Sequence, residues 1–196
     1  KVMAAAISND SIITIIFDEA PDSVSAFNVQ HYFMDVVGPP ISVGVDSINS
    51  KTFSLLFSQT FSATGIYHLH VHGIMDPHGN VSPDTQSFQL FIPSPPAVSD
   101  LVMTEIMSDP TSAPTLPPYE YLEIYNRSQK VIITSGFMLS DGSTIAYLPQ
   151  DTLFPGQYRA YTESSLVTFF HAAGYSEMKG IVGFPTLNND GERLKI

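Results

Sequence analysis

The sequence predicts an all-β chain built as two tandem β-sandwich domains, and three observations lead to this prediction. Short apolar runs recur between clusters of Gly, Pro, Asn, Asp and Ser, and hardly any segment shows a sustained helical period. Hydrophobic residues make up 43% of the 196 residues and include 13 Phe and 9 Tyr, which is ample core material. A proline-rich run at 92–97 interrupts the strand pattern near the middle of the chain. Two domains of ordinary size therefore fit the chain better than one large domain.

The first half of the chain contains six predicted strands, and several of them alternate between apolar and polar residues. In the fourth strand, Phe53, Leu55 and Phe57 face inward if successive side chains point to opposite faces. The predicted strands are Ile12–Phe17, His31–Val37, Ile41–Ile48, Thr52–Phe57, Ile66–His72 and Ser87–Ile92.

Three prolines mark the boundary between the two halves. Pro93, Pro95 and Pro96 fix φ and remove backbone donors, which gives a short extended connector of limited flexibility. We therefore expect a first domain over residues 1–93, a linker over 94–98 and a second domain over 99–196.

The second half contains seven predicted strands, one helix and a proline-rich loop from Pro110 to Pro118. Leu166, Phe169 and Phe170 fall at i, i+3 and i+4, which predicts a short helix over Ser164–Ala173. The predicted strands are Leu101–Ile106, Tyr121–Tyr125, Val131–Thr134, Phe137–Leu139, Thr144–Tyr147, Gln157–Tyr161 and Arg193–Ile196.

Several motifs occur in order in the first half of the chain. An early strand runs into an acidic turn at Ile13–Glu19, followed by Asn28 and Tyr32. Gly65–Val71 and Gly73–Asn80 then supply a strand that ends in a turn carrying an Asp and a Gly-Asn pair. In these motifs the first half resembles the bacterial immunoglobulin-like modules of surface-layer and adhesin-type proteins. The resemblance implies an immunoglobulin-like β-sandwich.

Five motifs occur in order in the second half: Thr104–Pro110, Glu120–Ser128, Gly136–Gly142, Leu153–Tyr158 and Pro185–Glu192. In these five motifs the second half resembles the lamin-tail domain. Phe137 stands where the family usually has Trp, which keeps an aromatic anchor of smaller volume. The family continues through at least one more strand after Ile196, so either the second domain is truncated here or its closing strand is not observed. Together the two resemblances imply two tandem immunoglobulin-like β-sandwiches of a kind that bacteria use as accessory parts of large secreted or surface-attached proteins, sometimes beside hydrolase domains.

Charge and composition narrow the classes of partner. The net charge is −11, with 8 acids against 2 bases in residues 1–96 and 11 against 6 in the remainder. Nucleic acids and anionic membranes are therefore poor partners, and the chromatin role of animal lamin tails is not expected here. No apolar run approaches the roughly 20 residues that a membrane span needs, so direct membrane insertion is not expected. We expect an extracellular, cell-surface or periplasmic domain pair whose targeting segment has been removed.

The absence of Cys excludes disulfides, thiolate zinc sites and Cys nucleophiles. His68, His70 and His72 are the candidate metal ligands, because alternate residues of a strand lie about 6–7 Å apart on one face, opposite Tyr67 and Leu69. A single ion held by all three needs a curved strand, or else a donor such as His78 or a carboxylate from another strand. The more frequent alternative is a solvated strand face without a physiological metal.

Two loops have calcium-binding or turn interpretations. Asp76–Asn80 offers oxygen ligands to Ca²⁺ but lacks the dense acidic spacing of a dedicated loop, so a turn with Gly79 or Asn80 at positive φ is favoured. Asn188–Gly191 has the same two interpretations, and its Asp-Gly pair favours a hairpin turn between strands.

The sequence gives little indication of a catalytic site. Glu105, Glu120 and Glu123 recur in the lamin-tail motifs and would gather on neighbouring strands, yet no nucleophile elbow or phosphate-binding loop accompanies them. Six tyrosines are candidates either for a binding platform or, in larger part, for the cores: Tyr119, Tyr121, Tyr125, Tyr147, Tyr158 and Tyr161.

The leading functional hypothesis is a non-catalytic structural or adhesive module that contacts a protein or glycan partner at the cell surface and requires no cofactor. Three alternatives stay open: an accessory metal- or glycan-binding domain of an extracellular hydrolase, a metal-dependent enzyme fragment that uses the histidine face with Zn²⁺, and a surface domain stabilised by Ca²⁺.

Overall fold

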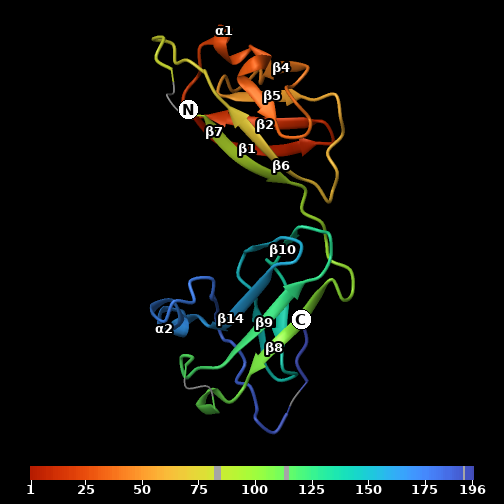
Figure 1. Cartoon of the computed structure of the whole chain (residues 1–196), viewed down its shortest axis with the longest axis vertical. Helices are drawn as coiled ribbons and strands as arrows, with labels where there is room; N and C mark the ends of the chain where they lie inside the picture. The colour runs from red at the N-terminus through yellow and green to blue at the C-terminus, as the bar shows by residue number, and fades with distance from the viewer. Residues whose placement is uncertain (82–84, 113–114, 192) are drawn as a thin grey trace. The chain divides into compact units, whose positions relative to one another are not determined.

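A computed structural model describes residues 1–81, 85–112, 115–191 and 193–196. It is built mainly of strands, which confirms the all-β prediction. The chain divides into two compact units, Lys1–Ile92 and Pro93–Ile196 (Figure 1). Part of the predicted proline-rich loop and Glu192, the last residue of one lamin-tail motif, lie outside the described residues.

The first unit contains two antiparallel sheets. In spatial order the strands of the four-stranded sheet are β1 (Val2–Asn9), β2 (Ile12–Phe17), β5 (Thr52–Leu56) and β4 (Ser42–Val45). Those of the three-stranded sheet are β3 (Tyr32–Met34), β6 (Ile66–Val71) and β7 (Gln86–Phe91). A short helix, α1 (Ser23–Ala26), and a 3₁₀ turn, η1 (Val29–His31), lead from the first sheet into the second. Six of these strands fall on predicted segments, and β1 is an additional strand.

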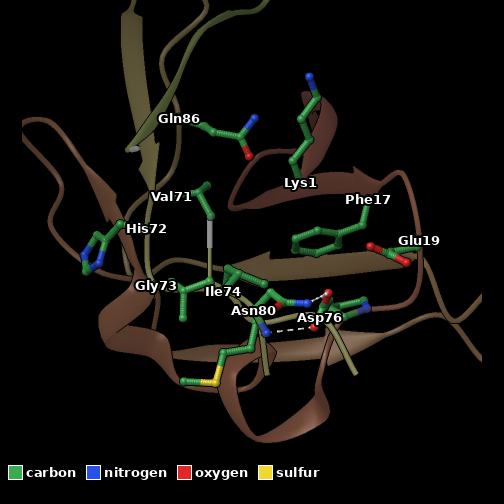
Figure 2. A pocket seen from close by; sticks show the side chains of 13 residues that line it. Lys1, Phe17, Glu19, Val71, His72, Gly73, Ile74, Asp76, Asn80 and Gln86 are labelled. Carbon is green, nitrogen blue, oxygen red and sulfur yellow. Dashed lines mark hydrogen bonds between the residues drawn. The ribbon is translucent and has the colours of Figure 1, made fainter. Parts of the chain in front are cut away.

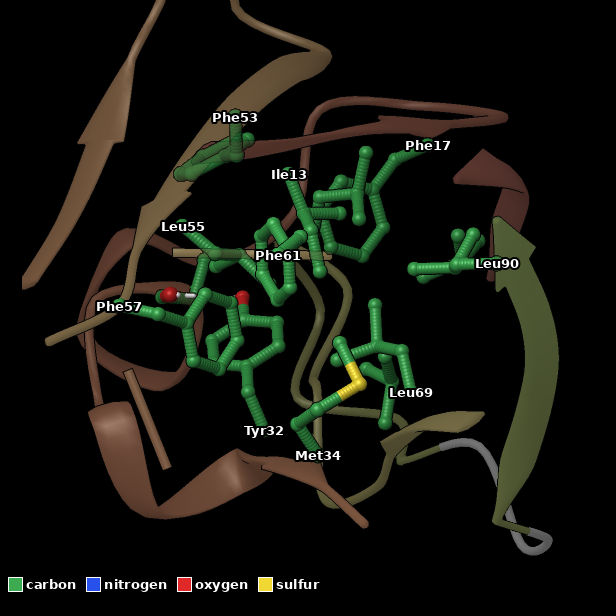
Figure 3. Packing of buried hydrophobic residues seen from close by; sticks show 14 residues of the cluster. Ile13, Phe17, Tyr32, Met34, Phe53, Leu55, Phe57, Phe61, Leu69 and Leu90 are labelled. Atoms are coloured by element: carbon green, nitrogen blue, oxygen red, sulfur yellow. Dashed lines mark hydrogen bonds between the residues drawn. The ribbon is translucent and has the colours of Figure 1, made fainter. Parts of the chain in front are cut away.

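Alternating side chains of the two sheets form one core in the first unit. Phe53, Leu55 and Phe57 are buried, as the alternation predicts. Tyr32 is fully buried beside them, and its hydroxyl donates to the carbonyl of Ala26 at 2.7 Å. Figure 3 shows this packing, with aromatic rings from both sheets meeting in the interior. The bond to Ala26 matters because a buried hydroxyl without a partner is costly.

The second unit is organised around a four-stranded sheet. Its spatial order is β15 (Lys179–Ile181), β14 (Tyr158–Glu163), β9 (Tyr121–Asn126) and β8 (Leu101–Met107). Strand β8 pairs with β9 through an irregular register between Met103 and Glu105. Two short pairs complete the strands: β10 (Ile132–Ile133) with β13 (Thr152–Leu153), and β11 (Met138–Ser140) with β12 (Ile145–Tyr147).

A helical crossover joins β14 to β15, which run parallel. It consists of η3 (Ser164–Leu166) and α2 (Val167–Ala172), so the predicted helix over Ser164–Ala173 is confirmed. Phe170 of α2 is buried against Tyr121 on one face of the sheet. Leu122 and Ile124 are buried on the opposite face, where Phe137 packs against their cluster. The sheet therefore carries a core on each side.

Two predictions about the second unit were wrong. Arg193–Ile196 does not form a strand, and Lys195 makes only an isolated bridge with Ser140. Asn188–Gly191 forms a turn, in which Gly191 has φ +92° and donates to the carbonyl of Asn188 at 3.1 Å, but no strands flank it as a hairpin would require. In both cases the local turn and β signals are genuine, but among the described residues the pairing goes no further than the bridge from Lys195 to Ser140 of β11.

In the described part of the chain, no helix combines the length and the apolar character needed to cross a membrane.

Candidate functional site

The histidine face lies on β6, where alternation separates core from solvent as predicted. Leu69 and Val71 are buried, whereas His68 is exposed and His70 is half-buried. Strand β6 is the central strand of its sheet, so His70 has neighbours on both β3 and β7. His70 lies opposite Phe33 on one side and Ser87 on the other.

Asp35, the residue that follows β3, is the acidic partner of two histidines. Its Oδ1 is 3.1 Å from Nε2 of His70, and its Oδ2 is 3.7 Å from Nδ1 of His68. Nδ1 of His70 is 2.8 Å from Oγ of Ser87. Both ring nitrogens of His70 therefore have hydrogen-bond partners, and the neutral tautomer that suits them donates from Nε2 to Asp35 and accepts from Ser87. The sequence predicted that a carboxylate from another strand could join the histidines, but it did not identify Asp35. No local pattern showed that β3 pairs with β6.

His72 does not join this cluster. Its ring packs against that of His31, with centroids 5.7 Å apart, and its backbone N–H donates to the carbonyl of His31 at 3.0 Å. Within residues 1–81, 85–112, 115–191 and 193–196, no group of three or more His, Asp or Glu side chains is arranged to hold a metal ion. The binding of one ion by His68, His70 and His72 stays a prediction. The contacts that the structure does show link β3, β6 and β7 through side chains.

A small cavity of about 210 Å³ opens beside His72 in the first unit (Figure 2). Phe17, Val71 and Ile74 supply apolar wall, and Asp76 and Asn80 lie next to each other below Phe17 in the view. Its volume is below the range of roughly 300–1,000 Å³ that is typical of small-molecule sites. This size argues against a substrate pocket at the end of the histidine strand.

The Asp76 carboxylate closes the turn that follows this cavity. Oδ1 accepts from the backbone N–H groups of His78 at 2.8 Å and Asn80 at 2.9 Å, and Oδ2 accepts from the Asn80 side chain at 2.7 Å. The bond from the Asn80 side chain, with the backbone bonds, lowers the pKa of Asp76. Gly79 has φ +82°, so the expected turn forms with Gly79 as the left-handed residue. Both carboxylate oxygens of Asp76, the acidic ligand that this loop offers to a Ca²⁺ ion, therefore accept hydrogen bonds within the turn.

The three glutamates of the lamin-tail motifs have separate structural partners. Glu105 accepts from the hydroxyl of Tyr121, and Glu123 accepts from Thr104 Oγ1 at 2.7 Å. Glu120 lies at the start of β9, where its Oε2 accepts from the backbone N–H of Leu187 at 2.9 Å. Glu105 and Glu123 face each other across the β8–β9 ladder, but Glu120 does not join them.

The six candidate tyrosines divide between core and surface. Tyr121 and Tyr161 are buried, whereas Tyr147 and Tyr158 are exposed by 62% and 54%. Tyr125 stacks on Tyr158 across the β9–β14 ladder with ring centroids 4.4 Å apart. The remaining member, Tyr119, is half-buried next to the exposed ring of Phe169, with centroids 5.1 Å apart. Burial thus accounts for two members of the set, and the others remain accessible at least in part.

No family model matches the chain, and no curated protein is similar to it. Similar solved structures include three of the S-layer protein SbsC, all at low identity. A crystal structure of rSbsC is 12% identical over 79% of this chain and 19% of that one, with a TM-score of 0.42. A structure of SbsC domains 1–6 is 10% identical over 83% of this chain and 32% of that one, with a TM-score of 0.42. A crystal structure of the N-terminal part of SbsC is 15% identical over 80% of this chain and 44% of that one, with a TM-score of 0.41. The chain spans less than half the length of each. The resemblances to immunoglobulin-like and lamin-tail domains stay predictions.

Proposed function

We propose that this chain is a non-catalytic structural or adhesive module of a larger secreted or cell-surface bacterial protein. The observation that carries the proposal is that the candidate polar groups hold the fold itself. His70 bridges Asp35 and Ser87, Asp76 closes its own turn, and Glu120 fixes the backbone at Leu187. Side chains engaged in this way support a scaffold, whereas a catalytic group needs an atom directed at a substrate.

Composition supports the same proposal. The chain carries 14% charged residues and a net charge of −11, and its two compact units are built mainly of strands around separate cores. A protein of this kind presents broad, polar, acidic surfaces to its surroundings, which suits contact with proteins or glycans and disfavours polyanions.

The second candidate function is an accessory metal-binding domain of an extracellular hydrolase. Asp35 contacts both His68 and His70, and imidazoles and carboxylates are ligands that Zn²⁺ accepts, although the described side chains are not arranged around one ion. A thermal melt of the metal-stripped protein with and without Zn²⁺ separates the two functions. A zinc-specific rise that disappears in His70→Ala and persists in His78→Ala supports the metal-binding function.

The principal test uses the full-length parent protein on its own cells. Protease treatment of intact cells should cleave the segment that contains this chain. In-frame removal of the segment should reduce surface attachment or assembly, and it should leave any enzymatic activity of the parent protein unchanged. The proposal is overturned if the segment is protected inside the cell, or if the purified chain itself releases reducing sugars or hydrolyses test esters in a manner abolished by Asp35→Asn.

A further inference from the structure

The second unit contains a cavity of about 480 Å³ at the end of the four-stranded sheet, where β9 begins and β14 ends. Its volume lies within the range typical of ligand sites, unlike that of the cavity beside His72. Tyr119, Leu166 and Phe184 form apolar and aromatic walls, with Pro110 and Pro118 at the rim. The cavity is open to solvent, and its walls Phe184 and Tyr119 pack against the two cores of the second unit.

Two carboxylates line this cavity, those of Glu120 and Glu163. The β9–β14 ladder ends where Tyr161 pairs with Leu122, and Glu120 and Glu163 each lie two residues beyond that pair. A 2.7 Å bond from Thr162 Oγ1 to the carbonyl of Glu120 holds the two segments together at this point. Segments that are far apart in the sequence therefore bring two acidic side chains to one cavity.

The fold keeps both groups in place without supplying a cation. Oε2 of Glu163 accepts from the backbone N–H of Phe184, and Oε2 of Glu120 accepts from that of Leu187, each at 2.9 Å. Burial would raise the pKa of Glu163, but the bonds from Ser164 and Phe184 outweigh burial and lower it, so the carboxylate is charged at neutral pH. Within the described part of the chain neither glutamate forms an ion pair, and no Lys, Arg or His lines the cavity.

We propose that this acidic, aromatic-walled cavity binds a cationic side chain, lysine or arginine, presented by a protein partner. The cation would meet two carboxylates in one cavity, and charge-assisted hydrogen bonds to carboxylates are among the stronger polar contacts. The methylene stem of such a side chain packs on apolar surface, and the rings of Tyr119 and Phe184 favour a nearby positive charge. The proposal deepens the proposed function, on which it rests for the presence of a protein partner.

The test titrates the whole chain with three acetylated, amidated tripeptides: Gly-Arg-Gly, Gly-Lys-Gly and the neutral isostere Gly-citrulline-Gly. Binding is monitored by the amide chemical shifts of the chain in nuclear magnetic resonance spectra. We expect saturable shifts around Tyr119, Glu163 and Phe184 with the two cationic peptides, weakening as salt is added, and none with citrulline. Glu163→Gln keeps an oxygen for the Phe184 N–H and should weaken binding about tenfold, the equivalent of one charge-assisted contact. Glu19→Gln removes the same charge in the first unit and should leave binding unchanged.

Equal binding of the citrulline and arginine peptides overturns the proposal, as does the absence of saturable shifts at the cavity. A methyl glycoside that saturates these same shifts while the cationic peptides do not would assign the cavity to a neutral sugar instead. None of these outcomes bears on whether the chain lies at the cell surface without catalytic activity, which protease treatment and the hydrolysis assays decide separately.

Discussion

At the scale of single residues, most polar side chains of interest act on the backbone or on a neighbouring strand. His70 illustrates this, because its two nitrogens reach Asp35 and Ser87 on opposite sides of β6. The alternation of β6 predicted that the histidines share a solvent-facing side. It did not predict which partners they meet, because that depends on the register of β3 and β7, which no local pattern specifies.

Asp35→Asn tests the contribution of this contact to stability. We expect the free energy of unfolding of the first unit to fall by about 0.5 kcal/mol, the ordinary value for a pair that is about half exposed. Chemical denaturation measures the change. His68→Gln is the matched control and should have a smaller effect, because His68 lies 3.7 Å from the carboxylate, beyond hydrogen-bond distance. A larger loss from His68→Gln than from Asp35→Asn would contradict this assignment.

Several exposed carboxylates make stability depend on pH in the acid range. In Asp141, hydrogen bonds from the backbone of Thr144 and Ser143 hold the pKa below the usual 3.8. A lowered pKa in the folded state means that the stabilisation is present above the unfolded pKa and is lost as pH falls through the folded one. The melting temperature should therefore decline as the pH drops below about 4. Asp141→Asn should reduce the decline in the second unit, and a pH-independent melting temperature would refute this account.

At the scale of elements, the crossover helix α2 stabilises the sheet face that the other strands leave uncovered. Phe170 is 1% exposed and meets Tyr121 edge to face, with ring centroids 5.9 Å apart. Its neighbour Phe169 is 51% exposed on the same helix. The i, i+3, i+4 spacing predicted the helix, but it could not decide which of the two adjacent rings is buried.

Phe170→Ala should lower the free energy of unfolding of the second unit by about 3–5 kcal/mol, because it leaves a cavity under the helix. Phe169→Ala removes the same atoms from a half-exposed position and should cost about 1 kcal/mol or less. Differential scanning calorimetry of the two variants measures both effects. Equal losses would mean that α2 does not pack as described.

Short elements account for most of what sequence reasoning missed. β13 has two residues and β15 has three, too few for any alternation to be visible. The strand predicted at Arg193–Ile196 has suitable residues but only one bridged partner, Ser140. The sequence did not predict that Glu120 and Glu163 line one cavity for a related reason, since the two residues are far apart in the sequence. Local propensity identifies candidate strands, whereas tertiary pairing decides which of them form.

At the scale of the whole molecule, each unit has a hydrophobic core made of its own residues. The core of Lys1–Ile92 includes Tyr32 and Phe57, and the cores of Pro93–Ile196 include Leu122 and Phe170. Units of about 100 residues with their own core are of a size that commonly folds alone. The proline run predicted a boundary at this point of the chain, because three fixed φ angles disfavour a continuous strand.

We expect residues 1–92 and residues 93–196 to fold when each is expressed separately. Dispersed amide resonances that overlay on those of the whole chain would show this for each unit. Phe170→Ala in the whole chain should then shift only the transition assigned to the second unit. Failure of either segment to fold alone would show that it needs the other.

The irregular register of β8 between Met103 and Glu105 affects whether this strand can pair with strands of other copies of the chain. In the described sheet, β8 pairs on one side only, with β9, so its other side is a free edge of seven residues that includes the exposed Ile106. A flat edge of this kind recruits strands from other copies, but a bulge twists the edge and breaks the sequence of free backbone groups. The irregular register of β8 therefore disfavours edge-to-edge pairing of this strand between copies of the chain.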